Sequence, residues 1–264
     1  MGAYLCKEQA DTRPQTKKLT LWGDHVNADT QAILSVLTIC RIEHEYNNLE
    51  TLKEEHKLCE EFARVSPIQE VPVITEGSYK IISGAAQFMV YLCNTRQKVK
   101  DQLYPKDCER LINRHMGFYQ NKLRPRTQRL AKMLTRKLQE ESGLVASETP
   151  RGQARMSFSV DPVNLELELE AVNKLLENLD AQLKSSGSKF FGSQLSLVDL
   201  AYYWEISTLQ HLLRREIVAP SFASLAAWFN EDMKRQEEIR SLEQKCFEAF
   251  SKHQGRASPA RAHR

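Results

Sequence analysis

The sequence predicts an α/β domain over residues 18–95 followed by an all-helical domain over residues 105–250. Two observations support this division. Before residue 96, short runs with the two-residue alternation of strands are interleaved with helical patterns. After it, only the spacing typical of helices recurs. Residues 96–104 are then the linker, residues 1–17 a flexible leading segment, and residues 251–264 a basic disordered tail.

The composition is that of an ordinary soluble protein, with 41% hydrophobic and 27% charged residues. No apolar run approaches the roughly 18 residues that a membrane span needs. The N-terminus lacks the apolar core of a signal peptide, so we expect a cytoplasmic protein. The net charge of +3 is too small to indicate nucleic acid as a partner. Six cysteines without a CxxC pair or a histidine at ligand spacing predict no metal site and no redox motif.

The first domain opens with an alternating strand, LTLW, at residues 19–22. We expect Asp29 to cap the helix that follows. A second strand is predicted near residues 43–49, and a surface helix lies within residues 52–65. The apolar positions of the first helix are Ile33, Val36, Leu37 and Cys40.

Two short apolar runs, at residues 72–74 and 79–82, are separated by Glu, Gly and Ser and predict a hairpin. The next helix has a buried stripe at Ala85, Phe88, Met89 and Leu92. The resulting order of strands and helices is that of a thioredoxin-like domain.

The second domain is expected to begin a helix near Tyr104 and Pro105. Pro125 should kink or interrupt a later helix. Residues 142–161 are predicted to form a mobile loop. Ser196 and Asp199 have the spacing of a capping box, which has a structural role. One face of a long helix carries Leu165, Leu169, Val172, Leu176, Leu179 and Leu183, with Glu166, Glu168 and Glu170 off that face.

Three segments together resemble the cytosolic glutathione transferases, most closely the theta-like branch. They are SPIQEVPVI at 66–74, LYPKDCERLINRH at 103–115, and FFGSQLSLVDLAYYWEI at 190–206 together with SLAAWF at 224–229. The resemblance covers residues 18–250. It implies a thioredoxin-like domain joined to an all-α glutathione-transferase domain, a cis-proline at Pro72, and a homodimer.

The resemblance also implies a position for the group that stabilises the glutathione thiolate. A free thiol, with a pKa of about 8.5, is only slightly ionised at neutral pH and needs such a donor. Theta-like proteins use a serine, and the matching residue is Asn27. The Asn27 amide can donate a hydrogen bond but cannot exchange a hydroxyl proton. Asn27 is therefore either the residue of a weakened catalyst or an ordinary turn residue.

The glutathione-binding positions implied by the family are mostly degenerate. Gly84 stands at the acidic position and Ala85 at the serine position that read the γ-glutamyl end. A one-residue slip would place Ser83 there, still without a carboxylate. Two lost hydrogen bonds to charged groups, each worth about 1.5–3 kcal/mol, would weaken affinity roughly a hundredfold to ten-thousandfold.

The glycine end of glutathione meets a similar change. Glu70 replaces a lysine that the family often has there, whereas Val71 and Pro72 keep the backbone edge. His56 and Lys57 lie where the family has a histidine for this end, or they belong to a solvated helix face.

The leading hypothesis is a glutathione-transferase-like protein with weak or no conjugating activity, acting as a binding or assembly module. Such a protein would use no cofactor, and glutathione would be a weak ligand at most. The alternative is an active theta-like transferase that conjugates glutathione to hydrophobic electrophiles.

A basic run and the N-terminus suggest further partners. Residues 111–139 contain no Asp or Glu, so the helix at residues 122–137 is either a surface for an acidic partner or a solvated face. Gly2 and Cys6 would tether the chain to a membrane if both were acylated; otherwise they belong to an unstructured start. The cations of the run are Arg114, Lys122, Arg124, Arg126, Arg129, Lys132, Arg136 and Lys137.

Overall fold

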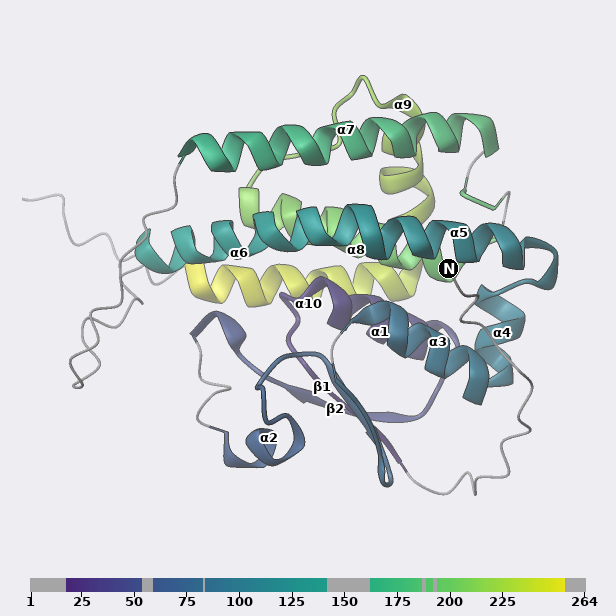
Figure 1. Ribbon diagram of the computed structural model, residues 1–264, viewed down its shortest axis with the longest axis vertical. Helices are drawn as coiled ribbons and strands as arrows, with labels where there is room; N and C mark the ends of the chain where they lie inside the picture. The colour runs from purple at the N-terminus through teal and green to yellow at the C-terminus, as the bar shows by residue number, and fades with distance from the viewer. Residues whose placement is uncertain are drawn as a thin grey trace, which may run out of the picture.

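The structure is a computed structural model that describes residues 18–53, 59–82, 84–141, 162–186, 189–191 and 194–254. An α/β half is followed by a helical half that lies over one side of it (Figure 1). This arrangement confirms the predicted fold class. The strands are β1 (Leu19–Gly23), β2 (His44–Asn48), β3 (Val73–Glu76) and β4 (Tyr79–Ile82). The first half also contains α1 (Ala28–Ile39), η1 (Thr51–Lys53), α2 (Glu60–Val65) and α3 (Ala85–Thr95).

The second half consists of helices in its described part. Two of its segments, η4 and η5, are π-helical. The segments are α4 (Gln97–Leu103), η3 (Lys106–Cys108), α5 (Glu109–Phe118), η4 (Tyr119–Leu123), α6 (Arg124–Glu141), α7 (Pro162–Ser186), α8 (Leu197–Leu213), α9 (Ala223–Ala227), η5 (Trp228–Met233) and α10 (Glu237–Gln254).

The four strands form a mixed sheet in the order β2-β1-β3-β4. β1 pairs with β2 in parallel and with β3 antiparallel. β3 and β4 pair antiparallel, which confirms the predicted hairpin. The turn between them is tight, and Gly77 supplies its left-handed backbone with φ 63°.

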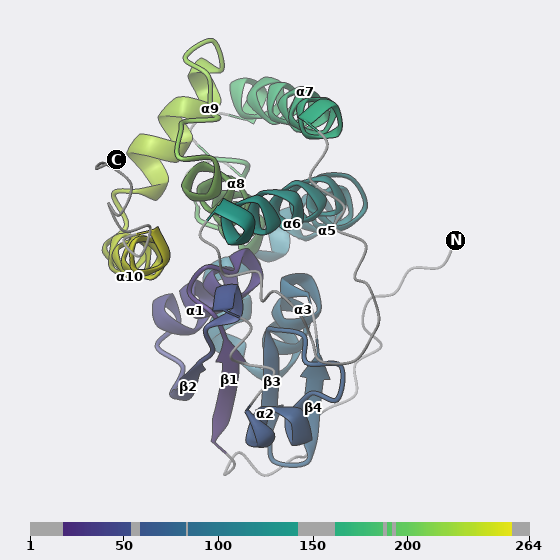
Figure 2. The same ribbon diagram turned by 90° about the vertical axis from the view of Figure 1, so that its left-hand side faces the viewer.

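Side-chain alternation along the strands divides the core between the two faces of the sheet. Leu21 and Ile74 belong to the large core cluster that includes the buried residues of α1 and α3. Their neighbours Trp22 and Val73 point to the other face, where they pack with Phe62 of α2. Figure 2 shows α1 and α3 between the sheet and the helical half, with α2 on the other side.

One sequence-based expectation about an acidic residue was wrong. Asn27, rather than Asp29, is the N-cap of α1, because its side chain accepts a hydrogen bond from the Thr30 amide. Asp29 lies within the first turn of α1 and is buried. Glu168 of α7 is also buried, and Arg126 and Arg129 of the adjacent helix pair with it.

The chain around Pro125 confirms that this proline interrupts regular helical structure. α5 and α6 form a nearly continuous rod, and the π-helical segment η4 joins them just before Pro125. A proline lacks the amide hydrogen and crowds the carbonyl four residues earlier, so a wider turn there accommodates its ring. The segment expected as the linker, residues 96–104, contains α4.

Helix α8 is the centre of the helical half and contacts α1 of the first half. The capping box is confirmed: Ser196 and Asp199 exchange side-chain and backbone hydrogen bonds at its start. Trp204 of α8 is fully buried and donates from Nε1 to Ser35 Oγ on α1 at 2.7 Å. Among the described residues, no helix is long and apolar enough to cross a membrane.

Candidate functional site between the two halves

The register of the sheet brings the family positions to one edge. Trp22 at the end of β1 is opposite Val73 at the start of β3, and Val73 is opposite Ile82 at the end of β4. The loops at these three strand ends therefore lie side by side. The family positions next to this edge are Asn27, Val71, Pro72, Gly84 and Ala85.

The side-chain oxygen of Asn27 forms hydrogen bonds within the fold. Its Oδ1 accepts hydrogen bonds from the Thr30 amide at 2.9 Å and from Thr30 Oγ1 at 3.2 Å. This orientation leaves the amide nitrogen Nδ2 as a donor on a half-buried residue at the positive end of α1. Asn27 can therefore act both as a helix cap and as a weak hydrogen-bond donor to an anion.

The Val71–Pro72 peptide bond is cis, as the resemblance implies. Val71 is half-buried and Pro72 is buried, whereas Glu70 is exposed. The Glu70 backbone carbonyl accepts a hydrogen bond from Ser66 Oγ at 3.3 Å. The backbone edge is thus present beside an exposed side chain of the wrong charge for a ligand carboxylate. His56, Lys57 and Ser83, which belong to the same expected site, lie outside the described residues.

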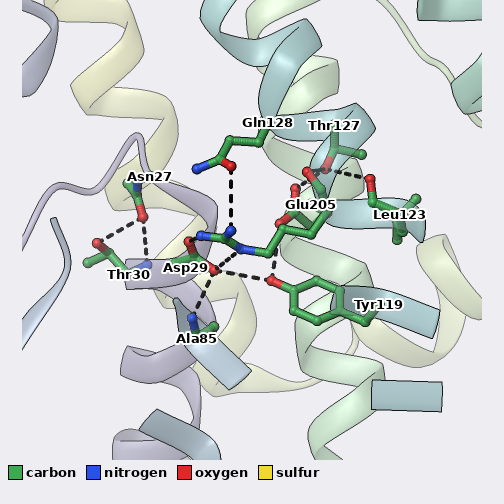
Figure 3. Close-up of polar contacts among 10 residues, drawn as sticks. Asn27, Asp29, Thr30, Ala85, Tyr119, Leu123, Thr127, Gln128 and Glu205 are labelled. Carbon is green, nitrogen blue, oxygen red and sulfur yellow. Dashed lines mark hydrogen bonds and ion pairs between the residues drawn. The ribbon is translucent and has the colours of Figure 1, made fainter. Parts of the chain in front are cut away.

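Asp29 fills the space between the start of α3 and the helical half (Figure 3). Its Oδ1 accepts from the Ala85 amide at 3.0 Å and from Tyr119 Oη at 3.1 Å. Arg124 donates to Oδ1 from Nε at 3.0 Å and to Oδ2 from Nη2. Asp29 therefore connects α1 with α3, η4 and α6 through one buried carboxylate.

Glu205 of α8 extends this network on the other side of Tyr119. Its Oε1 lies 3.1 Å from Tyr119 Oη, and its Oε2 accepts from Thr127 Oγ1 at 2.6 Å. Burial, followed by the charge of Asp29, raises the pKa of Glu205 to about 7. Burial and the two carboxylates likewise raise the pKa of Tyr119 well above its usual range. We call Asp29, Tyr119, Arg124, Thr127 and Glu205 the interdomain network.

Sequence reasoning missed this network. Asp29 was expected at a helix cap and Arg124 in a basic run that is either a surface for an acidic partner or a solvated face, because periodicity describes one helix at a time. The one local signal is an acidic residue within the first turn of a helix whose later positions carry no charge. That pattern also fits an ordinary cap.

The basic run of residues 111–139 is partly neutralised from within. Arg124 turns inward to Asp29. Arg126 and Arg129 lie 3.0 Å and 2.7 Å from the Glu168 carboxylate. Burial alone would raise the Glu168 pKa, but the hydrogen bonds and charges of the two arginines outweigh it and lower that pKa. The exposed lysines of the run are Lys122, Lys132 and Lys137.

The described part of the chain contains no group of three or more residues that could hold a metal ion. The five cysteines within it are free thiols, and two of them, Cys40 and Cys246, are buried. Burial raises the pKa of Cys40 to about 11, so this thiol stays protonated at neutral pH.

The whole fold and part of the sequence are similar to known glutathione transferases. Residues 156–245 match the family model described as the glutathione S-transferase C-terminal domain. Glutathione S-transferase theta-1 of Bos taurus is 31% identical over 91 residues, which span 34% of this chain and 37% of that protein. The sequence match thus covers little more than a third of the relative's length.

Solved structures share the fold over most of both chains. The apo form of human glutathione S-transferase T1-1 has a TM-score of 0.68 at 19% identity, covering 88% of this chain and 91% of that one. Glutathione transferase F7 of Populus trichocarpa has a TM-score of 0.68 at 16% identity, covering 86% and 99%. A homologue from Drosophila mojavensis with bound glutathione has a TM-score of 0.65 at 19% identity, covering 90% and 98%.

A thioredoxin-like sheet with a cis-proline edge, joined to a helical half around a capped central helix, defines the glutathione-transferase class of fold. Residues 156–245 match the C-terminal domain of the glutathione S-transferases, and the chain is similar to theta-like members of that family in part of its sequence and in its fold.

Proposed function

We propose that this chain binds glutathione weakly or not at all and works as a binding or assembly module on a glutathione-transferase fold. One observation carries the proposal: the amide of Ala85, at the start of α3, already donates to the buried Asp29 carboxylate at 3.0 Å. Backbone amides at a helix start are a natural place for a ligand carboxylate. Here an internal carboxylate uses that amide.

The surrounding charges support the same conclusion. Arg124, which could attract an anion, is paired with Asp29. A ligand carboxylate would approach the buried negative charge of Asp29 and would have to displace Asp29 from the Ala85 amide and from Arg124. Gly84 and Ala85 offer no side-chain donor or acceptor as compensation.

The alternative, an active theta-like transferase, is favoured by a different observation. Asn27 Nδ2 is a donor at the start of α1, beside the cis-proline edge, where a thiolate could be held. In that case the electrophile would be hydrophobic, and replacement of Asn27 by alanine would remove the thiolate donor.

A glutathione titration decides between the two functions. We expect calorimetry at millimolar glutathione to show no saturation, and conjugation of a generic electrophile to stay at the uncatalysed rate. Retention on immobilised glutathione, together with conjugation that Asn27→Ala abolishes, would contradict the proposal and establish the alternative.

Restoring the family side chains tests the position of the site. The double variant Gly84→Glu/Ala85→Ser should raise glutathione affinity, because it returns a carboxylate and a hydroxyl to the start of α3. A side chain at position 84 has open space, although the φ of 87° there costs about 1–2 kcal/mol for a non-glycine residue. The control Gln87→Glu adds the same charge at an exposed position of α3 and should leave affinity unchanged. Equal affinities for both variants would mean that the site lies elsewhere.

We also infer that the chain is a cytoplasmic homodimer and that the exposed Lys122, Lys132 and Lys137 favour an acidic partner. Similarity to a family whose members commonly form dimers supports the first inference, and the lack of Asp and Glu in residues 111–139 supports the second. Light scattering should give twice the chain mass.

Replacement of the three lysines by glutamate should abolish salt-sensitive binding of an acidic peptide, and unchanged binding would contradict the second inference.

A further inference from the structure

Three oxygen atoms, one from each of Asp29, Tyr119 and Glu205, form a chain that joins the two buried carboxyl groups of the interdomain network (Figure 3). Tyr119 Oη lies 3.1 Å from Asp29 Oδ1 and 3.1 Å from Glu205 Oε1. Each of these contacts needs a proton between its two oxygens. A tyrosine hydroxyl has a single proton, so it can satisfy one contact and not both. A second proton must come from one of the two carboxyl groups.

Asp29 is the carboxyl group that is surrounded by hydrogen-bond donors. It accepts from the Ala85 amide and from two nitrogens of Arg124, in addition to Tyr119. The amide and guanidinium groups can donate hydrogen bonds but cannot accept them, so they favour a carboxylate whose oxygens carry no proton.

Glu205 is surrounded differently. Its Oε2 accepts from Thr127 Oγ1, and its Oε1 faces Tyr119 Oη. If Oε1 carries a proton, Glu205 donates to Tyr119 Oη, and Tyr119 donates to Asp29. Every contact in the chain is then a complete hydrogen bond.

Charge counting gives the same assignment. The cation that faces the described network is Arg124, from α6, and it offsets Asp29, from α1. An ionised Glu205 would add a second negative charge in a fully buried position, which is strongly unfavourable.

Within the described part of the chain, the remaining neighbours of α8 supply no further cation to this network. On its other sides, His115 of α5 contacts Tyr202, and Glu243 of α10 accepts a hydrogen bond from Ser207. The α3 helix contributes the Ala85 amide, which is bound to Asp29.

We propose that Glu205 is a neutral carboxylic acid in the folded protein and that its proton completes the hydrogen-bond chain between α8, η4 and α1. Loss of this proton leaves an uncompensated charge between the two halves and weakens their contact. The interdomain network is therefore a pH-sensitive junction of the two domains.

The sign of the pH dependence follows from the Glu205 pKa, which burial and Asp29 raise from 4.5 to about 7. The folded state holds the proton more tightly than the unfolded state. The Glu205 contribution is therefore most favourable below about pH 4.5 and is lost as pH rises toward 7. Over that interval, ionisation of this one group should raise the unfolding equilibrium constant about a hundredfold.

The variant Glu205→Gln tests this inference. A glutamine mimics the neutral acid, because its NH2 group can donate to Tyr119 Oη and its carbonyl can accept from Thr127. In urea titrations at about pH 5, we expect Glu205→Gln to have the same stability as the wild type. At about pH 8, its unfolding equilibrium constant should be about a hundredfold smaller than that of the wild type. The matched control Glu166→Gln makes the same change at an exposed position of α7 and should follow the wild type at both pH values.

The opposite result would overturn the proposal. If Glu205 were ionised and paired with Arg124, Glu205→Gln would be less stable than the wild type at about pH 8 and similar to it at acid pH. Infrared difference spectra give an independent readout that needs no unfolding. At about pH 6, the wild type should show the carbonyl band of a protonated carboxylic acid that is absent from Glu205→Gln and present in Glu166→Gln. A wild type without this band would also overturn the proposal.

Discussion

Replacing Asp29 by alanine is expected to lower the free energy of unfolding by about 3–5 kcal/mol, because it leaves a largely buried cation without its partner. The Arg124 side chain is 20% exposed, and its charge is balanced by Asp29. The hydrogen bonds and charge of Asp29 outweigh burial and raise the Arg124 pKa, so the arginine cannot escape by losing its proton. The Ala85 amide and Tyr119 hydroxyl also lose an acceptor.

Urea unfolding at neutral pH measures this effect. Asp29→Asn should cost less than Asp29→Ala, because an amide oxygen can still accept from Ala85 although the charge is gone. Asp101→Ala, at an exposed position of α4, is the matched control and should stay within about 0.5 kcal/mol of the wild type. A loss below about 1 kcal/mol for Asp29→Ala would contradict the prediction and point to Gln128, 3.5 Å from Arg124 Nη1, as a sufficient substitute.

Replacing Asp199 by alanine is expected to cost about 2–4 kcal/mol, since it combines the loss of a helix cap with a buried donor left unpaired. Asp199 Oδ2 accepts from the Ser196 amide at 2.9 Å and from Ser196 Oγ at 2.5 Å. Its Oδ1 accepts from Trp228 Nε1 at 3.0 Å, which attaches η5 to the start of α8. All three residues are fully buried, so water cannot replace the missing acceptor without rearrangement.

Two further variants separate the parts of this effect. Ser196→Ala removes the hydroxyl that caps α8 but keeps the Trp228 contact, so it should cost about 1 kcal/mol. The full effect of Asp199→Ala should appear as a lower urea midpoint with an unchanged slope, as for a two-state loss of stability. Equal losses for the two variants would show that the Trp228 contact contributes nothing.

Local patterns predicted most of the elements. The alternation in LTLW, the hairpin signals around Gly77, and the apolar spacing of α1, α3 and α7 depend on residues a few positions apart. The capping box of Ser196 and Asp199 is equally local. Helix α4 was not predicted, because a short helix with Val99 and Leu103 as its buried residues gives too weak a period.

The features that sequence patterns did not predict concern polar residues whose partners lie on other elements. Asn27 and Asp29 are both suitable caps, and the backbone path of the turn placed Asn27 there. Glu168 belongs to a polar position of α7 by periodicity, yet Arg126 and Arg129 reach it from α6. Neither choice is visible from the spacing within one helix.

The sequence by itself determined the strands, the main helices and the side chains that the glutathione positions lack, because each is a property of neighbouring residues. Gly84, Ala85 and Glu70 are simply the residues present. The tertiary structure alone decided which residues contact Asp29. Asp29 meets Ala85 across 56 residues of sequence and Arg124 across 95. Contacts over such separations depend on how the two halves pack, and that packing brought one buried carboxylate to the start of α3.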